Sequence, residues 1–378
     1  MRLSRLILTD FRSYTDLRMD LPKGTTTLLG ANGAGKTNIV EAIRYLGTLS
    51  SHRVATDAPL IRAGAKRANI VGTVEKAGRS LALEVTIVSG GSNTARLNQS
   101  QVRPRDLAGL LRTVIFSPED VDLVKGEPSG RRRFLDDLCV ALSPVLAGDL
   151  VDYERVVRQR GTLLKSLRGK GTSASSLEVW NEKLAMLGAR ILKARVEAIG
   201  ALGPHVSAAY ADVAHTGSTC SLRYGGAIDV EATLASGGIK GVEEALLEEI
   251  ANESSRERER GVCLVGPHRD DLVLTIGDLP ARGFASHGES WSVALALRLG
   301  TYDLLTAGGG PDSGEEGEPV LILDDVFAEL DGSRRAALAE RASTAQQVLV
   351  TAAVGADVPA ALGGTVFTVE GGGVLANG

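Results

Sequence analysis

The segment from Gly30 to Thr37 has the residue types and spacing of a phosphate-binding loop. It matches the pattern G-x-x-x-x-G-K-[ST], in which glycines let backbone N–H groups turn toward an anion. The lysine of this pattern reaches the β- and γ-phosphates, and the hydroxyl can bind Mg²⁺. The sequence therefore predicts a site for a nucleoside triphosphate and Mg²⁺, built from Gly30, Ala31, Asn32, Gly33, Ala34, Gly35, Lys36 and Thr37.

Two acids that could complete this site follow the apolar run from Val320 to Leu323. A buried parallel strand has this composition, and its carboxyl end brings side chains to the sheet edge where ligands bind. We expect Asp324 to hold Mg²⁺ together with Thr37. Asp325 is expected to orient or deprotonate the attacking water, with Lys36 as the other catalytic group. A strand that simply ends in a polar turn is the alternative.

Ser286 and Gly288 could supply phosphate contacts of another kind. They precede residues 291–305, which predict a helix, and a helix N-terminus offers a hydroxyl and free N–H groups to an anion. Ser286 and Glu289 also form a capping-box pattern, in which each side chain binds the other residue's backbone N–H group. On this stretch alone, the two alternatives are equally favoured.

Periodicity predicts the elements that must position these groups. Residues 25–29 are β-branched and apolar, which predicts a buried strand before the phosphate loop, and residues 38–46 predict a helix after it. Residues 333–342 predict a helix beyond the acid pair. Further strands are predicted at residues 3–9, 17–21, 70–75, 80–88, 95–97, 114–116, 220–224, 262–265, 272–276 and 347–351.

The middle of the chain has a different pattern. From about residue 121 to 214 the signals are mainly helical, with apolar residues at three- and four-residue spacing in 150–167 and 177–202. A flexible turn at 168–173 separates these two segments, and 242–260 predicts one more amphipathic helix. We therefore expect an α/β ATPase head formed by residues 1–116 and 261–378, with a mainly helical lobe inserted at 117–260.

Composition limits the classes of protein that fit. The chain has 378 residues, 43% of them hydrophobic, and 42 Lys plus Arg against 46 Asp plus Glu give a net charge of −4. A nucleic acid would therefore need a local basic surface. Cys139, Cys220 and Cys263 stand far apart, which argues against a zinc site or a disulfide framework and fits a reducing cytosol. No apolar run approaches membrane-spanning length, so we expect a cytoplasmic protein without a membrane partner.

Two groups of basic residues are candidate DNA contacts. The first follows the phosphate-loop helix and the second opens the helical segment; they comprise Arg53, Arg62, Lys66 and Arg67, then Arg131, Arg132 and Arg133. A solvated loop is the alternative for the first group. Internal pairing with Asp136 and Asp137 on the same helix is the alternative for the second.

Several motifs together make the chain resemble the RecF family, recombination mediators in the ABC/SMC-like branch of P-loop ATPases, over nearly its full length. Besides the phosphate loop, the resemblance rests on 10–14 (DFRSY), 116–120 (FSPED), 131–136 (RRRFLD), 266–271 (GPHRDD) and 323–331 (LDDVFAELD). The last two are the most diagnostic. The resemblance implies an ABC-type P-loop ATPase head with a mixed sheet and an inserted, mainly helical lobe.

The resemblance also implies a mechanism. In an ATP-dependent homodimer, ATP would lie between the phosphate loop of one subunit and the signature motif of the other, with Ser286 and Gly288 on the partner's γ-phosphate and Asp331 in the D-loop. Arg12 resembles a position that approaches the nucleotide phosphates. RecF-like proteins bind duplex DNA next to single-stranded gaps and act with RecR and RecO to help load RecA. Their slow ATP hydrolysis implies that ATP is a binding switch.

Two departures from the family pattern concern the same site. Glu289 stands where family signatures usually have Gln, and a carboxylate repels a phosphate unless it turns away. Residues 117–120 occupy the place of the Q-loop glutamine. An SMC-like chromosome-organising ATPase is the nearest alternative, but it needs long coiled-coil arms. A transporter subunit does not account for the GPHRDD motif and the inserted lobe, and a small-molecule kinase has no use for the signature and D-loop motifs.

Overall fold

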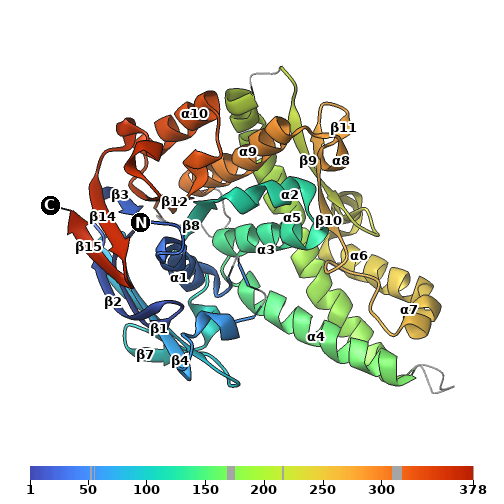
Figure 1. The fold of residues 1–378 in the computed structure, drawn as a ribbon. Coiled ribbons are helices and arrows are strands. Elements are labelled where there is room, and N and C mark those ends of the chain that lie inside the picture. The colour runs from blue at the N-terminus through green and yellow to red at the C-terminus, as the bar shows by residue number, and fades with distance from the viewer. Residues whose placement is uncertain (52, 55, 168–174, 215–216, 309–316, 378) are drawn as a thin grey trace.

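The head is built around a six-stranded mixed sheet. The computed structural model describes residues 1–377 except 52, 55, 168–174, 215–216 and 309–316 (Figure 1). The strand order is β15-β14-β3-β13-β12-β8, and every neighbouring pair is parallel except the β14–β15 hairpin. The strands are β3 (Gly24–Leu29), β8 (Thr113–Phe116), β12 (Val320–Asp324), β13 (Gln347–Ala352), β14 (Thr365–Glu370) and β15 (Gly373–Asn377).

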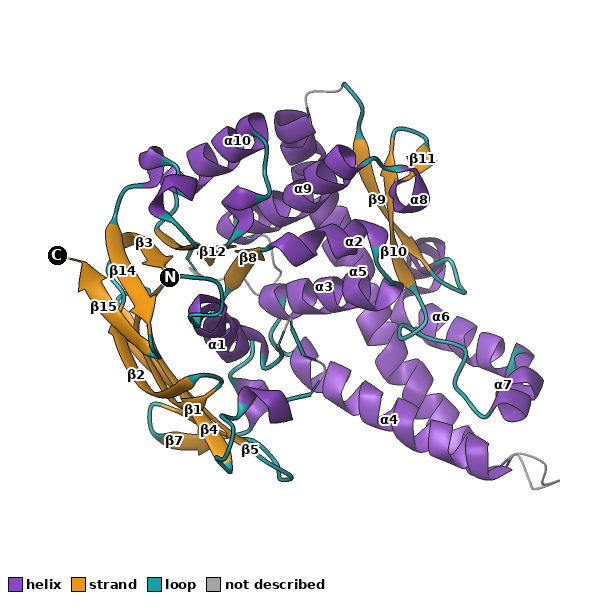
Figure 2. Ribbon diagram, in the orientation of Figure 1, coloured by secondary structure: helices purple, strands orange, loops and turns teal. Residues whose placement is uncertain are grey.

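A second six-stranded sheet is antiparallel and packs over helix α1 (Lys36–Thr48), which lies between the two sheets (Figure 2). Apolar residues of α1, including Ile39 and Ile43, share one core with Leu6 of this sheet and Ile322 of the central sheet. Its strands are β1 (Arg2–Phe11), β2 (Tyr14–Asp20), β4 (Arg67–Lys76), β5 (Arg79–Val88), β6 (Thr94–Leu97) and β7 (Ser100–Val102).

The other face of the central sheet is covered by helices. Because side chains alternate along a strand, Leu321 and Leu323 point away from α1 and join a second core with residues of α9 (His287–Thr306) and α10 (Gly332–Ser343). Short 3₁₀ turns connect several of these elements: η1 (Ala58–Leu60), η2 (Pro104–Asp106), η3 (Pro118–Val121), η4 (Val326–Ala328), η5 (Gly355–Asp357) and η6 (Ala360–Leu362).

The second core continues without a break into the helical lobe. The lobe also contains a three-stranded antiparallel sheet of order β11-β10-β9 at its edge, and the long helix α4 lies against α5 (Figure 1). No helix within the described ranges is long and apolar enough to cross a membrane. The lobe contains α2 (Asp122–Lys125), α3 (Pro128–Leu142), α4 (Leu146–Leu167), α5 (Ser175–Ala214), α6 (Val230–Asn252), α7 (Ser254–Arg260), α8 (Ala281–Phe284), β9 (Cys220–Gly225), β10 (Asp271–Ile276) and β11 (Leu279–Pro280).

Most predicted elements are confirmed, but the predicted strand at 262–265 is wrong. This segment has no strand partner because side chains bind its backbone groups: Glu257 Oε1 accepts from Leu264 N at 2.7 Å, and Arg269 Nε donates to Cys263 O at 2.8 Å. The predicted single helix at 242–260 is also wrong. It is divided between α6 and α7. α6 has a kink at Gly238, whose φ of 62° is not helical, and its first part begins at Val230, where Asp229 caps it.

The predicted turn at 168–173 lies outside the described residues. The division of the chain at 117 and 261 stays a prediction. Strand β10, from the segment predicted as head, pairs with β9 and β11 alone among the described strands, so the small sheet draws on both sides of the predicted boundary at 260.

Candidate nucleotide site

The phosphate loop joins the end of β3 to the start of α1. Gly33 and Gly35 have φ angles of 84° and 112°, which glycine adopts without strain, and a side chain at Gly35 would meet the Tyr14 hydroxyl at 2.7 Å. Helix α1 begins at Lys36 with no side-chain cap, which leaves N–H groups of its first turn for a ligand. Backbone donors and the helix dipole thus converge where a phosphate would bind.

Lys36 is folded back over its own loop. Its Nζ donates to the carbonyl oxygens of Gly30 at 2.7 Å and Ala31 at 3.4 Å, and it lies 3.9 Å from Asp325 Oδ1. The residue is only 3% exposed. To bind a phosphate, the ammonium group must exchange these carbonyl oxygens for phosphate oxygens.

Asp324 ends β12 beside the phosphate loop. Its Oδ1 accepts hydrogen bonds from Thr351 Oγ1 at 2.6 Å and from Thr37 Oγ1 at 3.4 Å. Burial raises the pKa of this carboxyl to about 6, despite the opposing effect of the Thr351 bond. A hydroxyl and a carboxylate oxygen held this close are the hard donors that Mg²⁺ prefers, so these residues fit the predicted metal site. Thr351 has no motif of its own and was missed by sequence reasoning.

The loop and the acid pair face a cavity of about 510 Å³, within the usual size range of small-molecule sites. Asp325, which adopts a left-handed φ of 50°, lines this cavity near Lys36, as the predicted catalytic pair requires. Arg53 also lines it, beside Asn38, although the sequence predicted Arg53 as a DNA contact. Its position makes Arg53 a candidate ligand of the nucleotide.

Arg12 does not face this cavity; it binds Glu41 of α1. The guanidinium donates two bonds to the Glu41 carboxylate, from Nε at 2.8 Å and from Nη2 at 2.7 Å. Glu41 is fully buried and also accepts from Ser51 Oγ and, at 3.4 Å, from Arg53 Nη1. Against the opposing effect of burial, these partners hold the pKa of Glu41 below its usual value. Glu41 was not among the predicted site residues, although an acid between apolar helix residues was an available signal in the sequence.

Ser286 and Glu289 form the capping box at the start of α9. The Ser286 hydroxyl accepts from Glu289 N at 3.2 Å, and Glu289 Oε2 accepts from Ser286 N at 2.9 Å, which lowers the pKa of Glu289. The capping alternative is therefore present in this structure. Ser286 is exposed at the helix start, so capping does not bury its hydroxyl.

Asp331 lies close to this helix start through Arg334. Asp331 caps α10 by accepting from Arg334 N at 3.0 Å, and it also binds the Arg334 side chain. The Arg334 guanidinium in turn donates to Gly288 O at 3.0 Å and to Ser292 Oγ at 3.0 Å. The predicted signature and D-loop residues therefore lie together on one surface of the chain.

The first group of predicted DNA contacts is scattered. Arg53 lines the nucleotide cavity, whereas Arg62 pairs with Asp10 at 2.7 Å. Lys66 and Arg67 are exposed at the start of β4. The structure does not bring these four side chains into one cluster.

In the second group of predicted DNA contacts, Arg131 is buried and paired, whereas Arg132 and Arg133 line a cavity. Arg131 is 2% exposed and makes a two-bond ion pair with Asp271 of the GPHRDD motif, with both bonds at 2.7 Å. Arg131 therefore has no free face for DNA, and its prediction as a DNA contact is corrected to a structural pair. The alternative of internal pairing within α3 is not observed either, because Asp136 binds Arg195 and Asp137 binds Arg44. Arg132 and Arg133 donate to backbone carbonyls and line a separate, larger cavity; they stay candidates.

His268 and Asp270 of the GPHRDD motif make polar contacts inside the lobe. His268 Nδ1 lies 2.7 Å from the Tyr153 hydroxyl, and burial lowers the pKa of His268 to about 4. Tyr224 donates to Asp270 at 2.9 Å, and burial raises the pKa of Asp270 to about 6. This motif therefore holds the lobe together and lies outside the set of residues that line the nucleotide cavity.

Relatives and solved structures match this chain over nearly its full length. Residues 2–360 match the family model described as RecF/RecN/SMC N terminal domain. The chain is 52% identical over 398 residues to "DNA replication and repair protein RecF" of Beutenbergia cavernae, covering 99% of each, and 51% identical over 383 residues to the protein of the same name from Frankia alni, also covering 99% of each.

Among solved structures, the recombination mediator protein RecF with ATP is 26% identical, with a TM-score of 0.88 over 100% of this chain and 97% of that one. An SMC head bound to the C-winged helix domain of ScpA gives a TM-score of 0.56 at 17% identity, over 100% of this chain and 97% of that one, and is similar in fold alone. The SMC-like alternative thus shares the ATPase head, while the full-length identity lies with the replication and repair proteins. With its ABC/SMC-type ATP-binding head and its mainly helical inserted lobe, the chain belongs to the RecF family.

Proposed function

We propose that this protein is an ATP-dependent DNA-binding switch of recombinational repair and replication restart. In this proposal, two subunits sandwich ATP, the dimer binds duplex DNA next to a single-stranded gap, and it acts with RecR and RecO to help load RecA. Slow ATP hydrolysis resets the switch. The resemblance to the family supports the partners, and the geometry supports the dimer.

One observation supports the proposed dimer. The cavity of about 510 Å³ is lined by the phosphate loop and Asp325, but none of Ser286, Gly288 and Asp331 is among its lining residues. Ser286 is nevertheless exposed at the N-terminus of a 20-residue helix, a position suited to an anion. A nucleotide in this cavity would therefore meet Ser286 and Gly288 only if a second subunit presented them.

The chain's own residues would divide the chemistry among them. Lys36 and the loop N–H groups would orient the β- and γ-phosphates, and Thr37 and Asp324 would hold Mg²⁺. When bound, Mg²⁺ would neutralise charge that develops on the phosphate oxygens. Asp325, 3.9 Å from Lys36 Nζ, would accept a proton from the attacking water, and Ser286 of the partner would donate to the γ-phosphate.

Molar mass in solution tests this proposal. We would measure light scattering of the full chain with no nucleotide, with Mg²⁺-ATP, and with Mg²⁺-ATP plus gapped DNA. The wild type should become a dimer only with ATP, and Lys36→Arg and Ser286→Ala should both weaken that dimer. Ser286→Ala should still bind ATP as a monomer, since Ser286 lies outside the cavity. A wild type that hydrolyses ATP but stays monomeric throughout would rule out the sandwich.

A further inference from the structure

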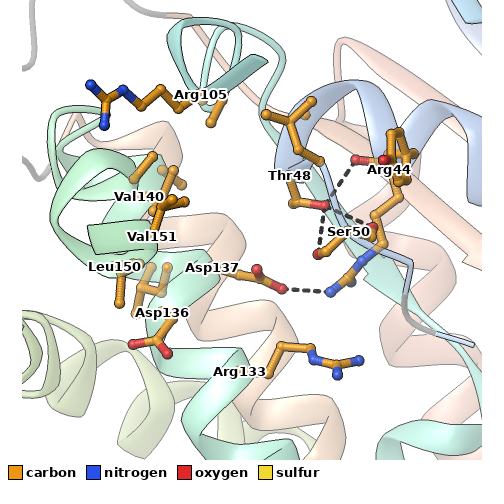
Figure 3. Close-up of a pocket in the computed structure, with 18 of the residues that line it drawn as sticks. Arg44, Thr48, Ser50, Arg105, Arg133, Asp136, Asp137, Val140, Leu150 and Val151 are labelled. Carbon is orange, nitrogen blue, oxygen red and sulfur yellow. Dashed lines mark hydrogen bonds and ion pairs between the residues drawn. The ribbon is translucent and has the colours of Figure 1, made fainter. Parts of the chain in front are cut away.

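A second cavity, of about 1,340 Å³, lies between the head and the helical lobe (Figure 3). The C-terminal half of α1 and the η2 loop form its head side, and α3 and α4 form its lobe side. Nine arginines line it against five acids. The chain as a whole carries a net charge of −4, so this cavity concentrates positive charge on a protein that otherwise lacks it.

Most of these arginines are neutralised within the cavity wall. Arg44 of α1, for example, pairs with Asp137 of α3 at 2.5 Å across the cavity floor, as Figure 3 shows. Arg132 and Arg133 differ, since no carboxylate of the described residues lies within ion-pair distance of either. Arg132 donates to Asp270 O at 2.8 Å and Arg133 to Ser51 O at 3.2 Å. Their charge is therefore available to an anion.

The lobe side of the cavity also has an apolar rim. Val140 of α3 and Leu150 and Val151 of α4 lie together at the cavity edge (Figure 3), and Val151 is 45% exposed. Arg133 lies across the cavity from this rim (Figure 3). A cavity with cations on one side and aliphatic side chains on the other matches a ligand with anionic groups on an apolar body. The phosphodiester backbone of a nucleic acid, with its sugars and bases, has this chemistry.

The Arg133 contact also connects this cavity to the nucleotide site. Arg133 binds the Ser51 carbonyl, and the Ser51 hydroxyl donates to Glu41. Glu41 holds both Arg12 and Arg53, and Arg53 lines the nucleotide cavity. Three consecutive polar contacts thus join a solvent-exposed arginine of the lobe to a side chain beside the phosphate loop.

We propose that the interlobe cavity binds the phosphodiester backbone of DNA through Arg132 and Arg133, and that Ser51 and Glu41 transmit this binding to the nucleotide site. The proposal rests on the DNA-binding function proposed above. A phosphate on Arg133 competes with the Ser51 carbonyl for the guanidinium. Releasing Ser51 changes the hydrogen bonds that hold Glu41, and thereby the position of Arg53 beside the nucleotide.

The binding half is tested with fluorescently labelled single-stranded and duplex oligonucleotides and the full chain, by anisotropy between 50 and 200 mM salt. Arg133→Gln and the double variant with Arg132→Gln should weaken binding at least fivefold. The log–log salt slope should fall by about 0.7 per lost contact on single strands and about 0.9 on duplex. Arg158→Gln is the matched control, because Arg158 is an α4 arginine, 70% exposed and outside the cavity lining.

The two oligonucleotides show whether a single strand or a duplex supplies the backbone. If the Arg133→Gln variant binds DNA as tightly as the Arg158→Gln variant, the cavity is not the DNA site. That result would leave the DNA-binding function itself intact. A wild type that binds neither oligonucleotide would overturn the DNA-binding function itself, and the cavity site with it. ATP-driven dimerisation, measured separately, distinguishes either result from misfolding.

The coupling half is tested by Ser51→Ala, which removes the hydroxyl but keeps the carbonyl that Arg133 binds. DNA should change the dissociation rate of a fluorescent ATP analogue from the wild type at least twofold. Ser51→Ala should bind DNA as the wild type does but lose most of that rate change. A variant that keeps the full effect of DNA would show that Ser51 does not carry the coupling.

Discussion

Thr37 Oγ1 lies 3.4 Å from Asp324 Oδ1, although the two residues are 287 positions apart in the chain. Parallel pairing of β13 with both β3 and β12 brings the ends of these strands to one edge of the sheet, where the phosphate loop begins. Asp324 is 4% exposed and raised in pKa, so its ionised form is poorly solvated without a cation. The sheet thus holds a carboxylate whose charge stabilises a bound metal ion but destabilises the fold when no cation is bound.

Asp324→Asn should therefore stabilise the protein and weaken nucleotide binding together. Because the folded pKa of about 6 exceeds the ordinary 3.8, Asp324 contributes stability below pH 4 that is lost as the pH rises through 6. The asparagine variant should not show this loss and should gain about 1–3 kcal/mol at pH 7. Urea unfolding at pH 4.5 and 7 measures the difference, and Mg²⁺-dependent ATP affinity should fall at least tenfold.

Asp325→Asn is the control for this prediction. The Asp325 side chain is 35% exposed, so its replacement should change the free energy of unfolding by less than about 0.5 kcal/mol. If Asp324→Asn instead lowers stability at pH 7, the Thr351 hydrogen bond outweighs the cost of burying the carboxylate, and our account of the raised pKa is wrong.

Glu289→Gln should separate capping from nucleotide contact. Glutamine also completes a capping box, so we expect the free energy of unfolding to change by less than about 0.5 kcal/mol. Removing the negative charge beside Ser286 should strengthen ATP-driven dimerisation severalfold, since that charge would face a phosphate of the partner's nucleotide. Light scattering across a concentration series measures the dimer constant. An unchanged constant would mean that the Glu289 carboxylate points away from the nucleotide in the dimer.

Arg131→Gln should destabilise the fold by about 2–4 kcal/mol, because it leaves Asp271 without its buried partner. Arg132→Gln, which loses only a bond to the Asp270 carbonyl, should cost about 1 kcal/mol or less. Urea unfolding of both variants, with Asp271→Asn and the double variant, gives the coupling energy of the pair. A coupling energy near zero would contradict a structural role and return Arg131 to the candidate DNA contacts.

The sequence predicted elements better than it predicted partners. The phosphate loop, the β12 acids and the start of α9 could be located because each depends on local spacing, and the parallel arrangement of β12 followed from its unbroken apolar run. Side-chain contacts between residues far apart in the sequence leave no such local pattern. Arg131 was predicted to contact DNA, with acids of its own helix as the alternative partners, yet it pairs with Asp271, which is 140 positions distant and placed by the fold.

The two wrong elements have a related cause. Residues 262–265 are apolar enough for a strand, but the Glu257 and Arg269 side chains occupy their backbone groups. Periodicity measures burial, which these residues do have, and gives no information about which groups satisfy the backbone. The Glu41 contacts were missed for the same reason, since a buried acid becomes interpretable only when its cationic partners are known.

Gly266→Ala tests whether the GPHRDD motif is structural. Gly266 has a φ of 118°, and a side chain there would clash with the Tyr153 hydroxyl. We expect a loss of about 2–5 kcal/mol from backbone strain and overpacking, measured by urea unfolding. Tyr153→Phe alone should also destabilise, because it leaves His268 Nδ1 without its partner.

Combining the two changes should cost less than the sum of the single changes, because removing the hydroxyl relieves the clash with the new methyl group. ATP affinity should stay within about twofold of the wild type in every variant that remains folded, since the network does not line the nucleotide cavity. Strict additivity would mean that backbone strain at Gly266 accounts for the whole effect. A selective loss of ATP affinity at unchanged stability would place the motif in the nucleotide site, contrary to the packing of His268 against Tyr153.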